Sequence, residues 1–259
     1  MKLISLNTWG GKIFNPLMDF VKQHSTDTDI FCFQEMFNTK SNIIEQVGFR
    51  LNLYSEISKI LADYQGYFHP CTENYVAGSF QRNLVDFNLS WGQSIFVSKK
   101  TKITSQGDFF VFGNKTSFNP KDENSVPRNV QYISFLYHGT QYTVGNLHGV
   151  WVRGPKIDTP ARIKQSEMIK AFLDQQKGEK ILVGDFNLDI NTKSIKILES
   201  NFRNLIKEYN ISSTRSKHYG KTDDKFADYI FISSEVTVKN FTVPDIEVSD
   251  HLPLILEFL

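Results

Sequence analysis

The stretch Val183-Gly184-Asp185-Phe186-Asn187 decides how this chain is interpreted, because an apolar run ends in it and two polar side chains follow. Ile181 and Leu182 precede it and extend the run, which predicts a buried strand. Asp185 and Asn187 stand two residues apart, so in an extended backbone they point to the same side. The stretch therefore presents a carboxylate and a carboxamide together at the exit of a strand.

Five other apolar segments carry polar side chains at one end, at Asn7, Glu35, His148, Asp228 and Asp250-His251. Asn7, Glu35 and His148 follow their apolar runs, whereas Asp228 and Asp250-His251 precede theirs. In layered α/β proteins, functional side chains gather where strands end along one edge of a sheet. We therefore expect the six junctions to form one mouth.

The first junctions belong to a strand, a helix and a second strand. Residues 2–7 and 29–34 are typical of buried strands, and Asn15-Pro16 is typical of a helix start. Apolar spacings of three, four and seven place one set of side chains on the inner face of that helix: Leu17, Phe20, Val21 and His24. The order predicts a parallel strand pair, which brings Asn7 and Glu35 to adjacent carboxyl ends.

The remaining pattern alternates many strands with few helices. Helices are predicted around Ile57, Ile60, Leu61 and Tyr64, from Thr159-Pro160 to a stop at Gly178, and over residues 194–198. Strands are predicted within residues 67–103, and over 107–113, 130–137, 141–146, 180–184, 228–233, 236–243 and 254–259, with a surface loop over 114–129. This balance predicts a mixed α/β sandwich in one domain over residues 1–259, and not a doubly wound sheet.

Composition excludes several classes of protein. The chain has 259 residues, 40% of them hydrophobic, and a net charge of only +1, so no global field favours nucleic acid or an anionic membrane. No apolar run reaches the roughly 18 residues that span a bilayer, and the first strand leaves no room for an export signal. Cys32 and Cys71 are too few for a disulfide framework. We expect a cytoplasmic monomer without a protein partner.

The polar side chains at the junctions favour one kind of metal. Carboxylate and amide oxygens suit Mg²⁺ or Mn²⁺, and no cluster of Cys and His has the spacing of a zinc site. Hydrolysis of a phosphoester needs such an ion, because charge on the transition state must be neutralised. His148 and His251 add groups that titrate near neutrality, one able to take a proton from water and the other to contact a phosphoryl oxygen.

These residues resemble, in order, the motif series of the endonuclease/exonuclease/phosphatase superfamily. The motifs span almost the whole chain: Leu6-Asn7-Thr8-Trp9, Gln34-Glu35, Asn146-Leu147-His148, Gly184-Asp185-Phe186-Asn187, Asp228-Tyr229 and Ser249-Asp250-His251-Leu252-Pro253. Gly-Asp-Phe-Asn followed by Ser-Asp-His is the most specific part. The resemblance implies a four-layer α/β sandwich of two mixed sheets, similar to pancreatic deoxyribonuclease.

The resemblance also implies residue roles. Glu35, with Asn7 and Asp250, would hold the metal, while Asp185 and Asn187 would orient water or the leaving oxygen. His251, held by Asp228, would be the general base, and His148 would contact the phosphoryl group or serve as acid. Deoxyribonuclease-like relatives pair that His with a Glu at a strand head that reads Ser90-Trp91-Gly92 here, which leaves the acid role of His148 open.

Two basic loops adjoin the site residues, over 151–164 and 212–225. In the first, Arg153 and Arg162 are candidate contacts for substrate phosphate, because a guanidinium forms forked hydrogen bonds with phosphate oxygens. Ordinary solvated loops would have the same composition.

Three functions remain open from the sequence. The first is a Mg²⁺- or Mn²⁺-dependent phosphoester hydrolase, in the manner of a phosphodiesterase, whose substrate is a small phosphoester or a nucleotide. The second is a DNA or RNA nuclease, which needs a basic stripe beyond the mouth. The third is a non-catalytic adaptor that binds a partner in the groove, although an adaptor would be expected to have lost some of these polar residues.

Overall fold

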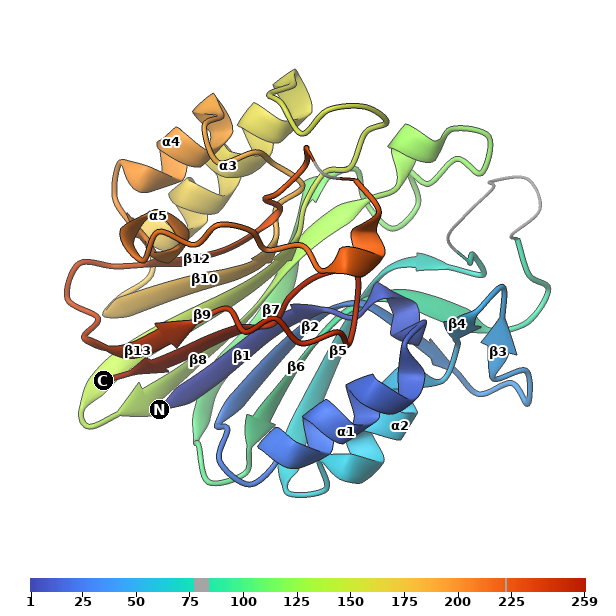
Figure 1. Ribbon diagram of the computed structural model, residues 1–259, viewed down its shortest axis with the longest axis horizontal. Coiled ribbons are helices and arrows are strands. Elements are labelled where there is room, and N and C mark those ends of the chain that lie inside the picture. The colour runs from blue at the N-terminus through green and yellow to red at the C-terminus, as the bar shows by residue number, and fades with distance from the viewer. Residues whose placement is uncertain (77–83, 222) are drawn as a thin grey trace.

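Two six-stranded sheets face each other in the computed structural model, which describes residues 1–76, 84–221 and 223–259. Helices α1 (Phe14–His24) and α2 (Leu53–Ile60) cover the outer face of one sheet, and α3 (Pro160–Asp174), α4 (Lys193–Glu199) and α5 (Leu205–Glu208) lie on the side of the other (Figure 1). The predicted sandwich of two mixed sheets with flanking helices is confirmed.

The first sheet has the order β13-β14-β1-β2-β6-β5, and the second has the order β11-β12-β10-β9-β8-β7. The strands of the first sheet are β13 (Val238–Thr242), β14 (Leu254–Phe258), β1 (Lys2–Asn7), β2 (Ile30–Thr39), β6 (Leu89–Ser98) and β5 (Tyr64–Glu73). Those of the second are β11 (Arg203–Asn204), β12 (Asp228–Ile232), β10 (Glu179–Asp185), β9 (Thr140–His148), β8 (Arg128–Tyr137) and β7 (Ile103–Phe112). A small hairpin joins β3 (Glu45–Gln46) to β4 (Phe49–Arg50), and single 3-10 turns occur at η1 (Trp9–Gly11), η3 (Glu123–Ser125) and η4 (Lys217–Tyr219).

Each sheet contains one parallel pair, as predicted for the first. In one sheet β1 runs parallel to β2, with Asn7 opposite Gln34. In the other β9 runs parallel to β10, with His148 opposite Asp185. The carboxyl ends of both pairs therefore carry polar side chains, and the facing sheets bring the two ends together.

Continuous apolar strands follow from burial on both faces. In β1, Leu3 joins the core between the sheets, whereas Ile4 and Leu6 pack toward α1 and α2. Such runs are typical of strands covered on both sides. Among the described residues, no helix is long and apolar enough to cross a membrane.

Some predicted boundaries were wrong. Helix α1 begins at Phe14, before Asn15-Pro16, and no side chain caps it. Helix α2 ends at Ile60, and Tyr64 starts β5 because its hydroxyl donates to the carbonyl of Ser25 (3.0 Å), which fixes the strand against the end of α1. Helix α3 ends at Asp174, before Gly178, where the backbone turns close to Gln141.

The predicted loop over 114–129 is too long at its carboxyl end. Arg128 and Asn129 are buried residues of β8, paired with Phe112 and Phe110 of β7. Their polar side chains resemble loop composition, but both point into the protein. Part of the predicted strand region within 67–103, residues 77–83, lies outside the described residues, as does residue 222 of the basic loop.

Candidate active site

Asp185 lies at the centre of the site because of strand register. It ends β10 opposite His148 of β9 on one side and Asp228 of β12 on the other. Gly184 precedes it with φ of 130°, and a Cβ there would lie 2.0 Å from the carbonyl oxygen of Leu147. Only glycine fits this close approach, so the sequence Gly-Asp is a structural requirement at the strand end.

Glu35 reaches the site through an irregularity in β2. The register between β2 and β6 shifts between Phe33 and Met36, and Glu35 has a left-handed φ of 57°. A bulge of this kind re-aims one side chain and is common beside active sites. The Asn7 side-chain amide then joins the sheets, donating to Glu35 Oε1 (3.2 Å) and to Asp185 Oδ2 (3.1 Å).

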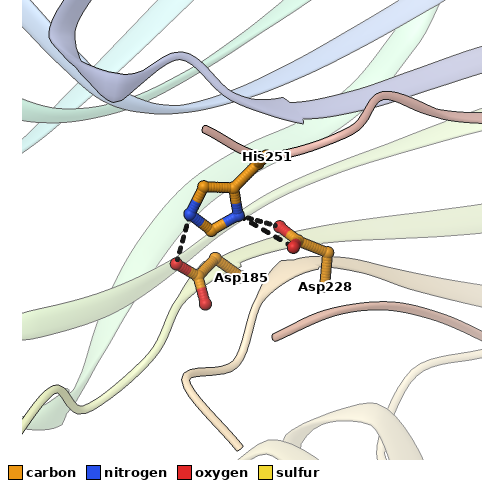
Figure 2. Close-up of side chains that lie close together, drawn as sticks. All are labelled: Asp185, Asp228 and His251. Carbon is orange, nitrogen blue, oxygen red and sulfur yellow. Dashed lines mark hydrogen bonds and ion pairs between the residues drawn. The ribbon is translucent and has the colours of Figure 1, made fainter. Parts of the chain in front are cut away.

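His251 and Asp228 form a buried pair beside Asp185. His251 Nδ1 lies 2.9 and 2.8 Å from the two carboxylate oxygens of Asp228, and its Nε2 lies 3.7 Å from Asp185 Oδ2 (Figure 2). Because a carboxylate only accepts hydrogen bonds, Nδ1 carries the proton, and Nε2 of the neutral ring carries a lone pair that can accept. Arg215 Nη1 donates to that Nε2.

His148 has a different partner. Arg128 Nη1 lies 3.0 Å from His148 Nδ1, and a guanidinium only donates, so Nδ1 accepts and the ring proton is on Nε2. That nitrogen faces Glu35 Oε1 at 3.6 Å and Asp185 Oδ2 at 3.7 Å. The ring of Trp91 packs edge-on against His148, with centroids 5.4 Å apart.

Asn187 is held by its neighbours. Its backbone N–H donates to Asp185 Oδ1 (2.8 Å), and its φ of 55° is left-handed. Lys156 Nζ donates to Asn187 Oδ1 (2.5 Å), and Asn187 Nδ2 donates to the carbonyl of Gly149 (3.2 Å). The carboxamide is therefore fixed beside Asp185 by a buried lysine.

Most of these side chains line a cavity of about 360 Å³, whereas Asn7 and Asp228 support it from behind the lining residues Glu35, Asp185 and His251. Its polar centre contains Glu35, Asp185, Asn187, Asp250, His148 and His251, together with Arg128, Lys156 and Arg215. The wall around this centre includes Trp9, Phe49, Tyr75, Trp91, Val126, Trp151 and Tyr219, with Glu123 and Lys221. The predicted mouth thus has a charged centre and an aromatic wall.

The charges of the centre shift its pKa values. Burial would raise the pKa of Asp185, but the rings of His251 and His148 and the cations of Arg215 and Lys156 outweigh it and hold the pKa below its usual range. Burial, with Asp250 nearby, raises the pKa of Glu35.

The pKa values of the basic groups are shifted as well. Burial and Arg215 would lower the pKa of His251, but the carboxylates of Asp228, Asp250 and Asp185 outweigh them and raise it. Burial lowers the pKa of Lys156 to about 8, and burial with Arg128 lowers the pKa of His148 well below 6.5.

One group of ligand atoms has the spacing of a metal site. Asp185, Asp228 and His251 each offer an atom, and the three atoms lie within 4.8 Å of one another. Nearby, Glu35 and Asp250 add oxygen donors to the same cavity.

The two arginines predicted to bind substrate lie elsewhere. Arg162 is fully buried and donates to the carbonyls of Val150 (3.1 Å), Pro155 (3.1 Å) and Ile157 (2.6 Å), so its guanidinium holds the loop that carries Lys156. Arg153 does not line the cavity. Its side chain is 79% exposed and pairs with Glu123.

Sequence reasoning missed the three cations that do line the centre. Arg128, Lys156 and Arg215 come from the start of β8, the loop before α3 and the loop before β12. Lys156 and Arg215 were counted only as charges of the two basic loops, and Arg128 was assigned to a surface loop. A lysine that follows His148 by eight residues is not a motif, so only burial reveals it.

Comparison with known proteins decides the family. A family model described as "Endonuclease/Exonuclease/phosphatase family" matches residues 4–251. The chain belongs to this family. No curated protein sequence is similar enough to count as a match.

Solved structures of this family share the fold. An endonuclease/exonuclease/phosphatase from Bacteroides vulgatus is 16% identical, with a TM-score of 0.71 over 100% of this chain and 98% of that one. A Bacteroides thetaiotaomicron mannosyl-6-phosphatase is 19% identical, with a TM-score of 0.70 over 100% of this chain and 99% of that one. The human Nocturnin catalytic domain, with a bound sulfate anion, is 17% identical, with a TM-score of 0.67 over 100% and 93% of the two chains.

Membership in the endonuclease/exonuclease/phosphatase family fixes the reaction class at a coarse level. The family is one of metal-dependent phosphoesterases, and the buried acidic and histidine side chains of this member fit a site of that kind. The substrate is not fixed by membership.

Proposed function

We propose that this chain is a divalent-metal-dependent hydrolase of small phosphoesters, in which water attacks the phosphoryl centre. One observation carries the proposal: His251 is held at Nδ1 by both oxygens of Asp228 while its Nε2 points to Asp185 in an open cavity. An imidazole oriented by a buried carboxylate, with its second nitrogen directed into a cavity, is the arrangement of a general base.

His251 takes the proton of the attacking water at Nε2 in this account, and Asp228 stabilises the imidazolium that forms. Arg215 now donates to Nε2, so it has to leave that nitrogen before water can approach. Asp185 and Asn187 orient the water or the leaving oxygen. His148 donates its Nε2 proton to a phosphoryl oxygen, because Arg128 occupies Nδ1.

Glu35, Asn7 and Asp250 are the residues that would hold Mg²⁺ or Mn²⁺, and Asn7 would have to turn its Oδ1 away from the N–H of Trp9 to become a ligand. The donor set fits, because burial and the nearby carboxylates of Asp250 and Asp185 raise the pKa of Glu35, and a bound cation would favour its ionised form. In the group Asp185, Asp228 and His251, the oxygens of Asp228 are already engaged by His251 Nδ1, which favours the first set. Such an ion, when bound, neutralises charge on the phosphoryl oxygens and the leaving group.

Metal binding by this set has a test that does not depend on turnover. Mg²⁺ or Mn²⁺ should raise the melting temperature of the wild-type chain, since a ligand that binds only the folded state stabilises it. Glu35→Gln should remove most of that increase, and Asp228→Asn should retain it. An equal increase in the two variants would contradict the assignment of Glu35 as ligand.

A small substrate is favoured over a nucleic acid. Aromatic side chains line the wall of the cavity, and Arg128, Lys156 and Arg215 are buried in it instead of forming an exposed basic stripe. A mannosyl-6-phosphatase shares the fold, which supports a phosphorylated small molecule as one class of substrate. The adaptor function is less favoured because all the candidate catalytic positions retain polar side chains suited to hydrolysis.

A panel of substrates tests the proposal. Bis-p-nitrophenyl phosphate, p-nitrophenyl phosphate, sugar phosphates, nucleotides, sphingomyelin, DNA and RNA would be assayed with Mg²⁺, Mn²⁺ or chelator. We expect metal-dependent hydrolysis of small phosphoesters by the wild-type chain and none by Asp185→Asn. Activity on nucleic acid alone would favour the nuclease, and a folded, metal-binding chain without any hydrolysis would favour the adaptor.

A further inference from the structure

Three buried cations meet in the cavity. The exposed fractions of Arg128, Lys156 and Arg215 are 5%, 5% and 9%. They come from three separate segments of the chain, and all three line the polar centre. Buried lysine and arginine side chains are rare unless they are paired with an anion.

None of the three has a carboxylate partner within 4.0 Å in the part of the chain that the structure describes. Their side-chain hydrogen bonds go to neutral acceptors instead: His148 Nδ1 for Arg128, Asn187 Oδ1 for Lys156 and His251 Nε2 for Arg215. In both arginines the Nε–H is buried without a hydrogen-bond partner. The charge of Asp185 offsets part of the charge of the three cations, and Arg128 and Arg215 lie over the rings of Trp91 and Tyr219. An anion in the cavity would supply the charged acceptor that these side chains lack at hydrogen-bond distance.

Each of the three cations contacts a residue that lies next to Asp185. Arg128 holds His148 and Arg215 contacts His251, and the Nε2 atoms of the two rings each lie 3.7 Å from Asp185 Oδ2. Lys156 approaches through Asn187, whose backbone N–H donates to Asp185 Oδ1. All three cations therefore line the cavity in which the proposed hydrolase would hold its phosphoryl group.

We infer that Arg128, Lys156 and Arg215 form a binding site for a terminal phosphate group, so that the preferred substrate is a phosphate monoester. The inference rests on the proposed function and deepens it. A terminal phosphate is a dianion with three free oxygens, and it can accept from two guanidinium groups and an ammonium group at once. A diester has only two free oxygens and a single charge, so part of the cationic set would stay unpaired.

The same contact frees the general base. A phosphate oxygen is a stronger acceptor for Arg215 than the neutral imidazole nitrogen that it now contacts. When Arg215 turns to the phosphate, Nε2 of His251 becomes available to the attacking water. Binding of a terminal phosphate thereby prepares the base, which a ligand without that phosphate would not do.

Two measurements test the inference, and the first does not depend on hydrolysis. The first is calorimetry of inorganic phosphate binding to the wild-type chain in chelator. We expect binding, and about 10-fold or greater weakening in Lys156→Met and in Arg128→Met, because a charge-assisted hydrogen bond is worth about 1.5–3 kcal/mol. The exposed Lys164 and the half-buried Arg203, which pairs with Glu208 outside the cavity, provide controls, and Lys164→Met and Arg203→Met should bind phosphate like the wild type.

The second measurement is the ratio of kcat/KM for p-nitrophenyl phosphate to that for bis-p-nitrophenyl phosphate. The wild-type chain should favour the monoester, and Lys156→Met should reduce that ratio by about 10-fold or more. A preference for the diester, or phosphate binding that is unchanged in Lys156→Met and Arg128→Met, would overturn the inference. Phosphate binding that depends on Lys156 and Arg128, without hydrolysis of any ester, would uphold the binding site and reject the proposed function.

Discussion

Lys156 shows how a functional charge acts on stability at the scale of one residue. Burial lowers its pKa to about 8, whereas the unfolded chain keeps the ordinary value of about 10.5. Below pH 8 both states carry the proton, and the folded state bears the full cost of the buried charge. Between these values the folded state loses its proton first, so stability increases with pH by about 3 kcal/mol in total.

Lys156→Met should therefore stabilise the ligand-free chain by about 3 kcal/mol at pH 7, because the buried charge is removed and the stem is kept. The variant should also lose the rise in unfolding free energy between about pH 8 and 10.5. Urea unfolding in chelator at pH 7 and pH 10 measures both effects. Lys164→Met serves as control, and the same pH dependence in Lys156→Met as in wild type would contradict the assigned pKa.

Individual residues were predictable when their chemistry coincided with a motif. Asp185, Asn187 and His251 follow or precede apolar runs in a specific order, and the structure brings them to one cavity. Arg128, Lys156 and Arg215 have no such signal, because many surface loops contain the same residues. Arg162 and Arg153 were chosen by charge and proximity in sequence, and neither criterion reveals whether a guanidinium contacts backbone carbonyls, a carboxylate or a ligand.

At the scale of elements, the site depends on how strands end. Asp185 is aimed by Gly184, whose φ of 130° brings the strand against the carbonyl of Leu147. Glu35 is aimed by the irregularity in β2. Strands and most helices were predictable from the periodic spacing of hydrophobic residues. The bulge at Glu35 was not, because the residues around it have the composition of an ordinary strand.

Gly184→Ala should destabilise the chain by about 3 kcal/mol or more, because the added Cβ collides with backbone and the φ is strained. The matched control is Gly139→Ala in the β8–β9 turn, where φ is 81° and no atom lies within 4 Å of the added Cβ. That control should cost about 1 kcal/mol, from strain alone. Denaturant unfolding of both variants measures the difference, and equal costs would refute the role of close packing at Gly184.

At the scale of the whole molecule, the site exists because two sheets are held face to face. Asn146 of β9 accepts from Gln34 Nε2 of β2 (2.6 Å) and donates to the carbonyls of Phe33 and Ser94 (3.2 Å each). Asn146 precedes His148 by two residues, and Gln34 directly precedes Glu35, so this buried contact lies beside the site. The sandwich was predictable from the sequence, but the way the sheets are joined depends on contacts between residues 52 to 113 positions apart.

Asn146→Ala should cost about 2–4 kcal/mol, because it leaves buried donors and acceptors of both sheets unpaired. It should also reduce kcat/KM, since the two halves of the site would lose their fixed spacing. Thermal unfolding and phosphoester hydrolysis measure the two effects. The control is Asn201→Ala, at an exposed asparagine that donates a hydrogen bond to Asp174. It should change the melting temperature and kcat/KM little. A stable Asn146→Ala with full activity would contradict this role of Asn146.

The central claim is that Asp185 and a divalent cation together hydrolyse a phosphoester in this cavity. The most direct test is hydrolysis of p-nitrophenyl phosphate by the wild-type chain and by Asp185→Asn, each with chelator and then with added Mg²⁺ or Mn²⁺. The account predicts activity that chelator abolishes, that metal restores only in the wild type, and that Asp185→Asn lacks while remaining folded. Activity that persists in chelator, or that Asp185→Asn retains with metal, would contradict it.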